Sequence, residues 1–245
     1  MTERALAGRA LAGRTIIVLG ATGGLGRAVT ERLRADGASV LATDAKIPAD
    51  AGAGAVGPDR LSYVEVDALD EGSISAAFAA ALAAAPAAAP VGGVINLIGG
   101  YTPPQGLSGL DIGVLRQQLE LNLVSAAIIT KYAMPMLAAR GGGPLVHVSS
   151  RVAVQDGANN FAYSVSKLGV VRLVEAAAAE GRGDGVRVNC IMPSIIDTPA
   201  NRAGLPDAAH DRWPKPSELA AVLAFLVSDE AILISGAAVP VYGRA

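Results

Sequence analysis

The 245-residue chain has few of the residues that build disulfides or metal sites. It contains one cysteine, Cys190, and two histidines, His147 and His210. A single cysteine excludes an intrachain disulfide and fits a reducing compartment, so we expect a cytoplasmic protein. The cysteine and the histidines show no metal-ligand spacing, so we expect no metal site.

The chain also lacks a strong charge of either sign and a long apolar run. It has 20 Lys and Arg against 22 Asp and Glu, a formal net charge of −2. This balance predicts no basic surface for nucleic acid or anionic lipid. The stretch 76–89 is apolar mainly through alanine and is interrupted by proline. It favours a helix from near Ser73 to Pro86 over a membrane span. We therefore expect neither a nucleic-acid partner nor a membrane partner.

What the sequence contains instead is a regular alternation of short apolar runs and longer helical patterns. Strands are predicted over residues 15–19, 38–43, 62–66, 92–98, 144–149, 186–191 and 237–241. Helices are predicted over residues 24–36, 73–85, 111–139, 161–180 and 216–228. Wholly apolar strands suit a sheet covered on both faces, and the alternation implies right-handed crossovers. We predict an α/β fold: a single-domain, doubly wound Rossmann sheet, mostly parallel, of about seven strands, preceded by a loosely ordered segment 1–13.

The first predicted strand runs into the glycine-rich turn 20–26, Gly-Ala-Thr-Gly-Gly-Leu-Gly, and then into a helix. Glycines at such a turn let backbone N–H groups approach a pyrophosphate, and the helix N-terminus adds a partial positive charge. A glycine-rich turn alone is weak evidence in a chain with 29 glycines. Its position between a strand and a helix favours a dinucleotide site over an ordinary turn.

The second predicted strand ends at Asp44, 18 residues after Gly26. A carboxylate at this place accepts hydrogen bonds from the ribose hydroxyls and repels a 2′-phosphate. Gly23 also gives the turn no cation for that phosphate, so we expect NAD to be preferred over NADP, although Lys46 lies close by. The alternative is that Asp44 only caps a turn. Asp67, after the third strand, is a second candidate for an adenine contact.

Tyr163 and Lys167 stand four residues apart on a predicted helix and so share one face. A phenol has an ordinary pKa near 10, and a neighbouring ammonium lowers it toward the range that acid–base catalysis needs. The pair follows a strand that ends in Ser149 and Ser150. Ligands of such sheets bind beyond the carboxyl ends of the strands. Tyr163 is therefore the predicted general acid and base.

Taken together, these motifs resemble the short-chain dehydrogenase/reductase family in its compact form, over roughly residues 14–243. The turn matches the family's Gly-x-x-x-Gly-x-Gly loop, and the helix matches its Tyr-x-x-x-Lys pair. The resemblance implies a catalytic set of Asn122, Ser150, Tyr163 and Lys167, with Ser150 chosen over Ser149 by its spacing of thirteen residues from the tyrosine. The expected cofactor contacts are Gly20, Thr22, Gly23, Gly24, Leu25, Gly26, Asp44, Asp67, Asn96, Tyr163, Lys167, Pro193, Ile196 and Thr198.

The resemblance also implies roles for the catalytic set. Tyr163 donates a proton to a carbonyl oxygen or removes one from an alcohol, and Ser150 hydrogen-bonds that oxygen. Lys167 lowers the pKa of the tyrosine and holds the nicotinamide ribose. Asn122 fixes a water that relays protons to solvent, and Thr198 holds the nicotinamide carboxamide.

Two positions depart from the family pattern. Asn96-Leu97-Ile98-Gly99 stands where the family has Asn-Asn-Ala-Gly. Leu97 replaces an asparagine that ties strands together, so this role either passes to Asn96 or is lost. Ser194 replaces the glycine of a Pro-Gly turn, which is expected to alter the loop over the nicotinamide.

The sequence thus predicts a nicotinamide-dependent oxidoreductase that acts on a small alcohol or carbonyl substrate. Two alternatives remain: a pteridine- or quinone-like ring reductase on the same scaffold, and a non-catalytic NAD(H)-sensing module. A sensing module would be expected to lose Tyr163, Lys167 or Ser150. Residues 198–213 are the expected substrate lid, and Tyr101 and Trp213 are candidate ring contacts. By resemblance we expect a homo-oligomer, a tetramer or a dimer, with helices near 111–139 and 161–180 as interfaces.

Overall fold

The computed structural model describes residues 10–47, 61–85, 87–155 and 158–244, and these form one seven-stranded sheet. The strands are β1 (Thr15–Leu19), β2 (Ser39–Asp44), β3 (Leu61–Glu65), β4 (Val91–Asn96), β5 (Gly143–Val148), β6 (Val186–Pro193) and β7 (Ala238–Val241). Their order is β3-β2-β1-β4-β5-β6-β7, and every neighbouring pair is parallel. The predicted doubly wound sheet is confirmed.

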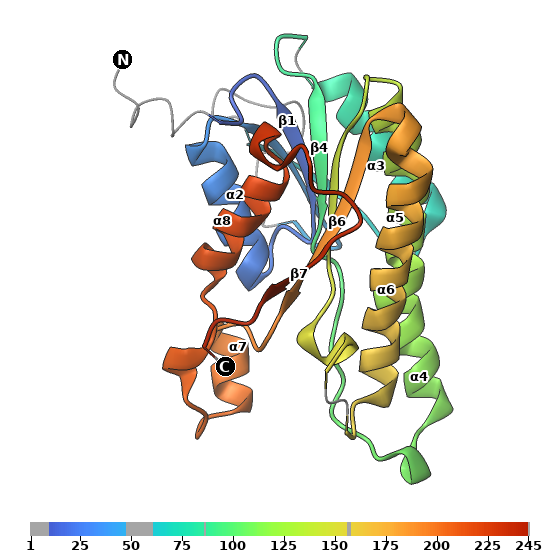
Figure 1. The fold of residues 1–245 in the computed structure, drawn as a ribbon, viewed down its shortest axis with the longest axis vertical. Helices are drawn as coiled ribbons and strands as arrows, with labels where there is room; N and C mark the ends of the chain where they lie inside the picture. Colours follow the sequence, from blue (N-terminus) through green and yellow to red (C-terminus); the bar gives the residue numbers. More distant parts are fainter. Residues whose placement is uncertain (1–9, 48–60, 86, 156–157, 245) are drawn as a thin grey trace.

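Helices cover both faces of this sheet (Figure 1). They are α2 (Gly24–Ala35), α3 (Glu71–Ala84), α4 (Ile112–Leu119), α5 (Ser125–Ala138), α6 (Phe161–Glu180), α7 (Pro199–Gly204) and α8 (Pro216–Leu226). One core cluster joins the sheet to α2 and α8, with Leu33 and Leu223 fully buried. The other joins it to α3, α5 and α6, with Ile129 and Val174 fully buried. Because apolar side chains meet helices on both sides, the strands read as continuous apolar runs.

The predicted helix 111–139 is interrupted. A π-helical turn, η2 (Glu120–Val124), separates α4 from α5. Such one-turn bulges inside α-helices occur mostly at functional sites. Asn122 lies in the middle of this turn and is almost fully buried. The predicted helical stretch is thus confirmed over Ile112–Ala138, with a π-helical turn that was not predicted at the place where Asn122 lies.

The stretch Ile112–Ala138 is 27 residues long with a hydropathy of 1.3, so by length and composition it meets the test for a membrane-spanning helix. Its inner side packs on the sheet, where Ile129, Ala133 and Leu137 are fully buried. A buried core helix passes the same test, so this finding is weak evidence for a membrane span.

The chain before β1 is more ordered than predicted where the structure describes it. Leu11 is fully buried, and its backbone N–H donates to the Asp36 carbonyl oxygen at 3.1 Å. Residues 10–13 form a turn that packs against the end of α2, whereas residues 1–9 lie outside the described part of the chain. The predicted helix near Ser73 begins earlier, at Glu71, because the Asp70 side chain caps it by accepting from the Gly72 N–H.

Gly26 sets how closely α2 packs on the end of β1. A Cβ at this position would lie 2.3 Å from the Gly20 carbonyl oxygen and 2.6 Å from the Ala21 carbonyl carbon. Both are backbone atoms that cannot turn aside. Glycine is therefore required here by the close approach of two backbone segments.

We expect Gly26→Ala to lower the free energy of unfolding by roughly 1–3 kcal/mol or more, because the added methyl group overlaps backbone atoms. Thermal and urea denaturation measure this loss. The matched control is Gly183→Ala, where an added Cβ meets nothing within 4 Å. A Gly26→Ala variant as stable as the control would contradict the packing argument.

Candidate active site

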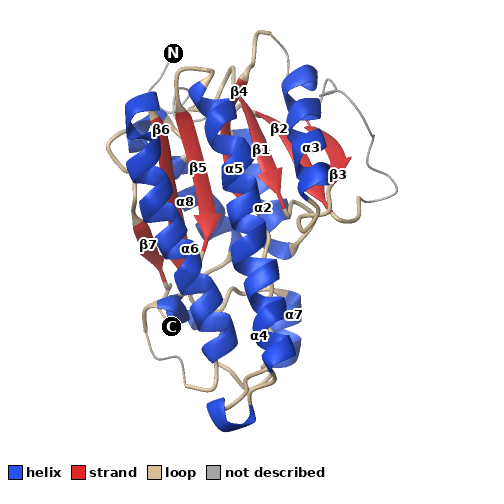
Figure 2. Ribbon diagram, turned by 90° about the vertical axis from the view of Figure 1, so that its right-hand side faces the viewer, coloured by secondary structure: helices blue, strands red, loops and turns tan. Residues whose placement is uncertain are grey.

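The predicted site residues gather at the carboxyl ends of the strands. Figure 2 shows the strand arrows pointing toward the end of the molecule where α4 and α7 lie. The chain leaves β1 toward β2 on one side, and β4 lies on its other side, so strand order reverses between β1 and β4. Ligands of doubly wound sheets bind at this reversal. The glycine turn follows β1 directly, and Gly99 and Gly100 follow β4.

The glycine turn fits a pyrophosphate. Gly20 has a φ of +80°, a conformation that favours glycine. Helix α2 begins at Gly24 with no side-chain cap and no acidic residue in its first turn. This helix end therefore carries no side-chain cap and no acidic residue of its own, as an anion site at a helix N-terminus requires. A Cβ on Gly24 would lie 3.1 Å from the Thr198 methyl carbon, so Thr198 lies directly over the turn.

Asp44 is bound to the glycine turn. Its Oδ2 accepts from the Thr22 backbone N–H at 3.0 Å and from the Thr22 hydroxyl at 2.7 Å. Its Oδ1 accepts from the Ala45 N–H at 2.8 Å. Asp44 was predicted either to bind the cofactor ribose or only to cap a turn. It fixes the turn, and it also places a negative charge at the carboxyl end of β2, so both interpretations have support.

Sequence reasoning missed a cation at this turn. The Arg27 side chain donates from Nε to the Thr22 carbonyl oxygen at 2.9 Å. This contact holds a guanidinium at the glycine turn, although Gly23 itself offers no charge. The signal was present in the sequence, since Arg27 follows the last glycine of the motif and so lies in the first turn of α2.

The remaining predicted cofactor contacts are spread along the same edge. Asp67 is exposed after β3, and its Oδ1 accepts from the Leu69 N–H at 2.9 Å. Pro193 ends β6, and the Ile196 carbonyl accepts from the Thr198 N–H at 2.8 Å. The Thr198 hydroxyl oxygen caps α7 by accepting from the Asn201 N–H. Leu25 turns inward and packs against the core between the sheet and α2.

Tyr163, Ser150 and Lys167 come together at the ends of β5 and α6. The Ser150 side chain hydrogen-bonds to the Tyr163 hydroxyl. The Lys167 Nζ lies 5.9 Å from the Tyr163 ring centre and donates to the Val148 carbonyl at 3.0 Å. Ser149 differs from Ser150, because its hydroxyl is buried and donates to the Lys167 carbonyl at 2.8 Å. The geometry thus brings Ser150 to the phenol and uses Ser149 to tie α6 to β5.

The pKa values of this group differ from the sequence-based expectation. Burial raises the pKa of Tyr163 above its usual value, and the hydrogen bond from Ser150 only partly opposes this. Burial also lowers the pKa of Lys167 to about 8. The expected lowering of the phenol pKa by the ammonium is therefore not seen in the protein alone, because burial is the largest influence on the pKa of Tyr163.

Asn122 clamps the loop after β4. Its Oδ1 accepts from the Gly100 N–H at 2.9 Å, and its Nδ2 donates to the Gly100 carbonyl at 3.0 Å. Nδ2 also lies 3.0 Å from the Ser166 hydroxyl. A Cβ on Gly99 would lie 2.7 Å from both Asn122 Oδ1 and Lys167 Nζ. Asn122 and Lys167 therefore approach the same point, which is open only because residue 99 has no side chain.

The strand-tying role of the missing asparagine is taken by Asn96. Its Oδ1 accepts from the Ile98 N–H at 3.0 Å, so its Nδ2 is the group that faces His147 Nδ1 at 3.1 Å. His147 Nε2 lies 3.1 Å from the Thr130 hydroxyl, which itself donates to the Ala126 carbonyl. Only a neutral His147 protonated on Nε2 satisfies this chain. Burial, and secondly the charge of Lys167, lower its pKa to about 3. The Asn96 side chain thus bridges β4 and β5, and its polar atoms face into the sheet.

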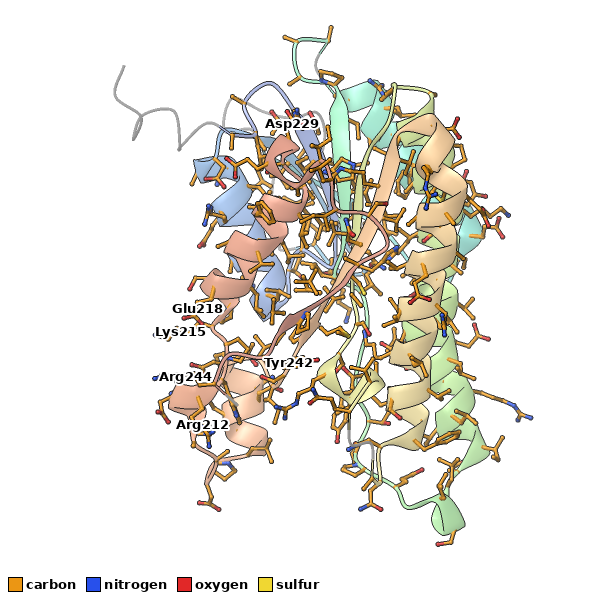
Figure 3. All side chains as sticks on the ribbon, in the orientation of Figure 1. Arg212, Lys215, Glu218, Asp229, Tyr242 and Arg244 are labelled. Carbon is orange, nitrogen blue, oxygen red and sulfur yellow. The ribbon has the colours of Figure 1, made fainter. Side chains whose placement is uncertain are left out.

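Ser194, the second position that departs from the family pattern, links the chain after β6 to the chain after β7. The Ser194 hydroxyl donates to the Tyr242 carbonyl at 2.7 Å. This bond fixes the segment after β6 to the segment after β7. Figure 3 shows Tyr242 on that C-terminal segment.

The two candidate ring contacts differ. Tyr101 is 56% exposed and packs edge-on against Tyr163, with ring centres 5.1 Å apart. Its hydroxyl donates to Asn160 Oδ1 at 3.1 Å. Trp213 is buried and packs against His210. Tyr101 therefore lies exposed beside Tyr163, whereas Trp213 is buried and packs within the segment 198–213 that was expected to form the lid.

A cavity of about 990 Å³ does not coincide with the predicted site residues. It lies at the opposite, amino end of the strands, and none of the predicted site residues lines it. The described residues contain no cluster of histidine, cysteine or acidic side chains that could hold a metal ion. The titratable groups with the largest shifts lie instead around Lys167.

Comparison with known proteins gives one consistent family. The family model described as enoyl-(acyl carrier protein) reductase matches residues 20–243. The chain is 35% identical to cis-4-hydroxycyclohexanecarboxylate dehydrogenase of Sinomonas cyclohexanicum, over 96% of this chain and 98% of that protein. It is 30% identical to 2,5-dichloro-2,5-cyclohexadiene-1,4-diol dehydrogenase of Sphingobium indicum, over 92% and 94%. A putative short-chain dehydrogenase/reductase from Burkholderia xenovorans has a similar structure, with a TM-score of 0.83, 28% identity and coverage of 96% and 97%.

The buried ammonium of Lys167 makes a testable contribution to stability. Its pKa is about 8 in the folded protein against 10.5 for an ordinary lysine, so folding disfavours the charged form. This penalty is fully present below pH 8 and disappears as the pH rises toward 10.5. We expect Lys167→Met to abolish activity and to raise the free energy of unfolding at pH 7 by roughly 1–3 kcal/mol.

Urea denaturation at pH 7 and pH 9.5 measures this gain, which should shrink at the higher pH. Lys46→Met, at an exposed position, is the control and should change stability little at either pH. A Lys167→Met variant that is less stable than the unmodified protein by the same amount at both pH values would show that the ammonium carries no burial penalty.

Proposed function

Because the chain belongs to the short-chain dehydrogenase/reductase family, we propose that it moves a hydride between a nicotinamide cofactor and a secondary alcohol or its ketone, with Tyr163 as the general acid and base. The observation that carries this proposal is the hydrogen bond between Ser150 and the Tyr163 hydroxyl at the carboxyl end of the sheet, beside the buried Lys167. The open helix end at the glycine turn supports a dinucleotide at the same edge.

The residues divide the reaction as follows. When bound, the nicotinamide ring accepts or supplies the hydride. In alcohol oxidation Tyr163 takes the hydroxyl proton while the hydride leaves the same carbon, so a ketone forms and the charges balance. In reduction Tyr163 returns a proton to the oxygen. Ser150 holds that oxygen by a hydrogen bond, and Lys167 provides a positive charge that favours the phenolate.

We propose NAD as the preferred cofactor. Asp44 places a carboxylate at the end of β2, where it repels a 2′-phosphate and accepts from ribose hydroxyls. Its Oδ1 accepts a hydrogen bond from the Ala45 backbone N–H, and a carboxylate oxygen has a further lone pair for a ribose hydroxyl. Arg27 is the opposing influence, because its guanidinium lies beside the same turn.

The substrate class we propose is a hydroxyl group on a six-membered carbocycle, or the corresponding ketone. Two relatives at 30% identity or more are named for alcohols of this kind. Tyr101 supports the proposal, since its exposed ring stands edge-on to Tyr163 and offers an apolar wall for a flat or chair-shaped ring.

Tyr163→Phe should reduce kcat by roughly 10²–10⁴-fold, because it removes the proton-transferring group and keeps the ring. The NADH dissociation constant should change little. Turnover is followed at the nicotinamide absorbance with cyclic alcohols and ketones, and with a dihydropteridine and a quinone to detect a ring reductase. Tyr132→Phe is the control, since that hydroxyl binds Glu71 away from the site. Full turnover by Tyr163→Phe would rule out the proposed chemistry.

Asp44→Asn should weaken NADH binding and tighten NADPH binding, so that their affinity ratio falls by roughly tenfold. The amide removes the charge and keeps an acceptor for Thr22. Asp44→Ala removes both, and should also lower the melting temperature. Fluorescence titration of the two cofactors measures the ratio. If the unmodified protein binds NADPH more tightly than NADH, the assignment of Asp44 is wrong.

A further inference from the structure

Residues 198–213, the expected lid segment, form a loop whose two ends meet. The Asp197 N–H, just before the lid segment, donates to the carbonyl of Pro214, just after it, at 2.9 Å. Arg202, inside the loop, forms a two-bond ion pair with the Asp197 carboxylate at its base. Compact loops whose ends lie close together are held largely by their own side chains and are frequently functional. The lid segment can therefore be positioned as a whole from its base.

The start of the lid segment lies over the glycine turn. A Cβ on Gly24 would lie 3.1 Å from the Thr198 methyl carbon. Helix α7 begins at the next residue, and Figure 2 shows it at the end of the molecule toward which the strands point. A shift of the lid segment would therefore change the space beside the turn.

The end of the lid segment is held by the C-terminal residues. The Arg244 N–H donates to the Arg212 carbonyl at 3.0 Å, and Arg212 Nε donates back to the Arg244 carbonyl at 3.0 Å. The Arg244 guanidinium also donates to the Asp211 carbonyl at 2.9 Å. Figure 3 shows Arg212 and Arg244 close together. Because the two segments bond in both directions, their relative position is fixed.

Gly243 permits this close approach. Its φ is +68°, a conformation that favours glycine. A Cβ here would lie 2.9 Å from the Arg212 carbonyl oxygen and 3.0 Å from the Pro214 nitrogen. Both are backbone atoms at the base of the lid segment, so a larger residue would push the two segments apart.

The C-terminal residues are themselves anchored to the sheet. Strand β7 pairs with β6, with Val241 beside Pro193. The Ser194 hydroxyl donates to the Tyr242 carbonyl at 2.7 Å. The lid segment is thus tied through residues 242–244 to the edge of the sheet.

We propose that Gly243 and Arg244 are positioning residues for substrate binding, because they hold the lid segment in the place where it binds substrate. This proposal rests on the proposed function. Without the contact, the lid segment spends part of its time in other positions, and the apparent affinity for substrate falls in proportion to the competent fraction. KM should therefore rise, whereas kcat should not, since bound substrate draws the lid segment back and the proton transfer at Tyr163 is untouched.

The first test is steady-state reduction of 4-methylcyclohexanone, with NADH and with NADPH. Gly243→Ala and Arg244→Gln should each raise KM by roughly 2- to 10-fold, as expected for the loss of about one hydrogen bond. The change in kcat should stay below about twofold. Arg244→Lys keeps a charged donor and should recover part of the affinity.

The second test is hydrogen exchange of the free protein, followed by mass spectrometry, which needs no substrate. Peptides from residues 199–213 should exchange roughly 2- to 10-fold faster in Gly243→Ala and Arg244→Gln, because local opening becomes easier. Peptides from α6 should exchange as in the unmodified protein.

Two matched variants at the opposite, amino end of the strands are the controls. Gly141→Ala adds a Cβ at a glycine with a φ of +85°, where it meets nothing within 4 Å. Arg182→Gln removes an exposed arginine beside the cavity at that end. Both should leave KM and the exchange of residues 199–213 unchanged.

The outcomes separate this proposal from the proposed function. If neither Gly243→Ala nor Arg244→Gln speeds exchange of residues 199–213, the contact does not position the lid segment, and the proposal fails while the proposed function stands. Faster exchange with an unchanged KM also overturns it, because the lid segment then takes no part in substrate binding. A fall in kcat with faster exchange throughout the protein would show that the two residues only stabilise the fold.

Failure of the proposed function gives a different result. In that case the unmodified protein neither reduces the ketone nor oxidises 4-methylcyclohexanol with NAD or NADP. The role of Gly243 and Arg244 in substrate binding then fails with it, whatever the exchange of residues 199–213.

Discussion

The site depends on the burial of one ammonium group. Lys167 is only 4% exposed, and its Nζ lies between the end of β5 and the loop after β4. A charge in such a place is costly unless polar groups surround it. The glycine at position 99 and the π-helical turn around Asn122 both serve this need. Gly99 leaves room for the ammonium, and the π-helical turn brings the Asn122 amide oxygen to the same point.

The polar groups around and beneath the ammonium make hydrogen bonds that also hold the scaffold together. Asn122 joins the π-helical turn η2 to the loop at Gly100, and Ser149 joins the end of β5 to α6. Asn96 and His147 join β4 to β5 beneath them. Buried networks of this kind are stabilising only when every member is satisfied, so each residue depends on the others. These bonds therefore fix the ends of β4 and β5 relative to each other and to α6.

Periodic and local features of the structure were predictable from the sequence. The seven strands and the main helices follow from apolar runs, and the glycine turn and the Tyr163–Lys167 pair follow from spacing. The π-helical turn at Asn122 was not predictable, because apolar spacing does not distinguish it from the α-helix on either side, and the contact of Asn122 with Gly100 is tertiary. The direction of the Tyr163 pKa shift was not predictable either, because desolvation depends on how the side chain is packed, and residue spacing does not show that packing. Arg27 follows the glycine motif in the sequence, but spacing alone gave no reason to propose it as a cation of the turn. Its hydrogen bond to the Thr22 carbonyl supplies that reason.

The shifted pKa values suggest how the protein alone sets the resting state of the site. Burial keeps the Tyr163 phenol protonated, and the Lys167 pKa near 8 leaves the ammonium charged at neutral pH. The free protein therefore holds the Tyr163 proton at neutral pH. The hydrogen bond from Ser150 opposes the effect of burial, and a positive charge near the phenol acts in the same direction as that bond. In the function that we propose, reduction would use this proton, and oxidation of an alcohol would need the phenol to lose it first.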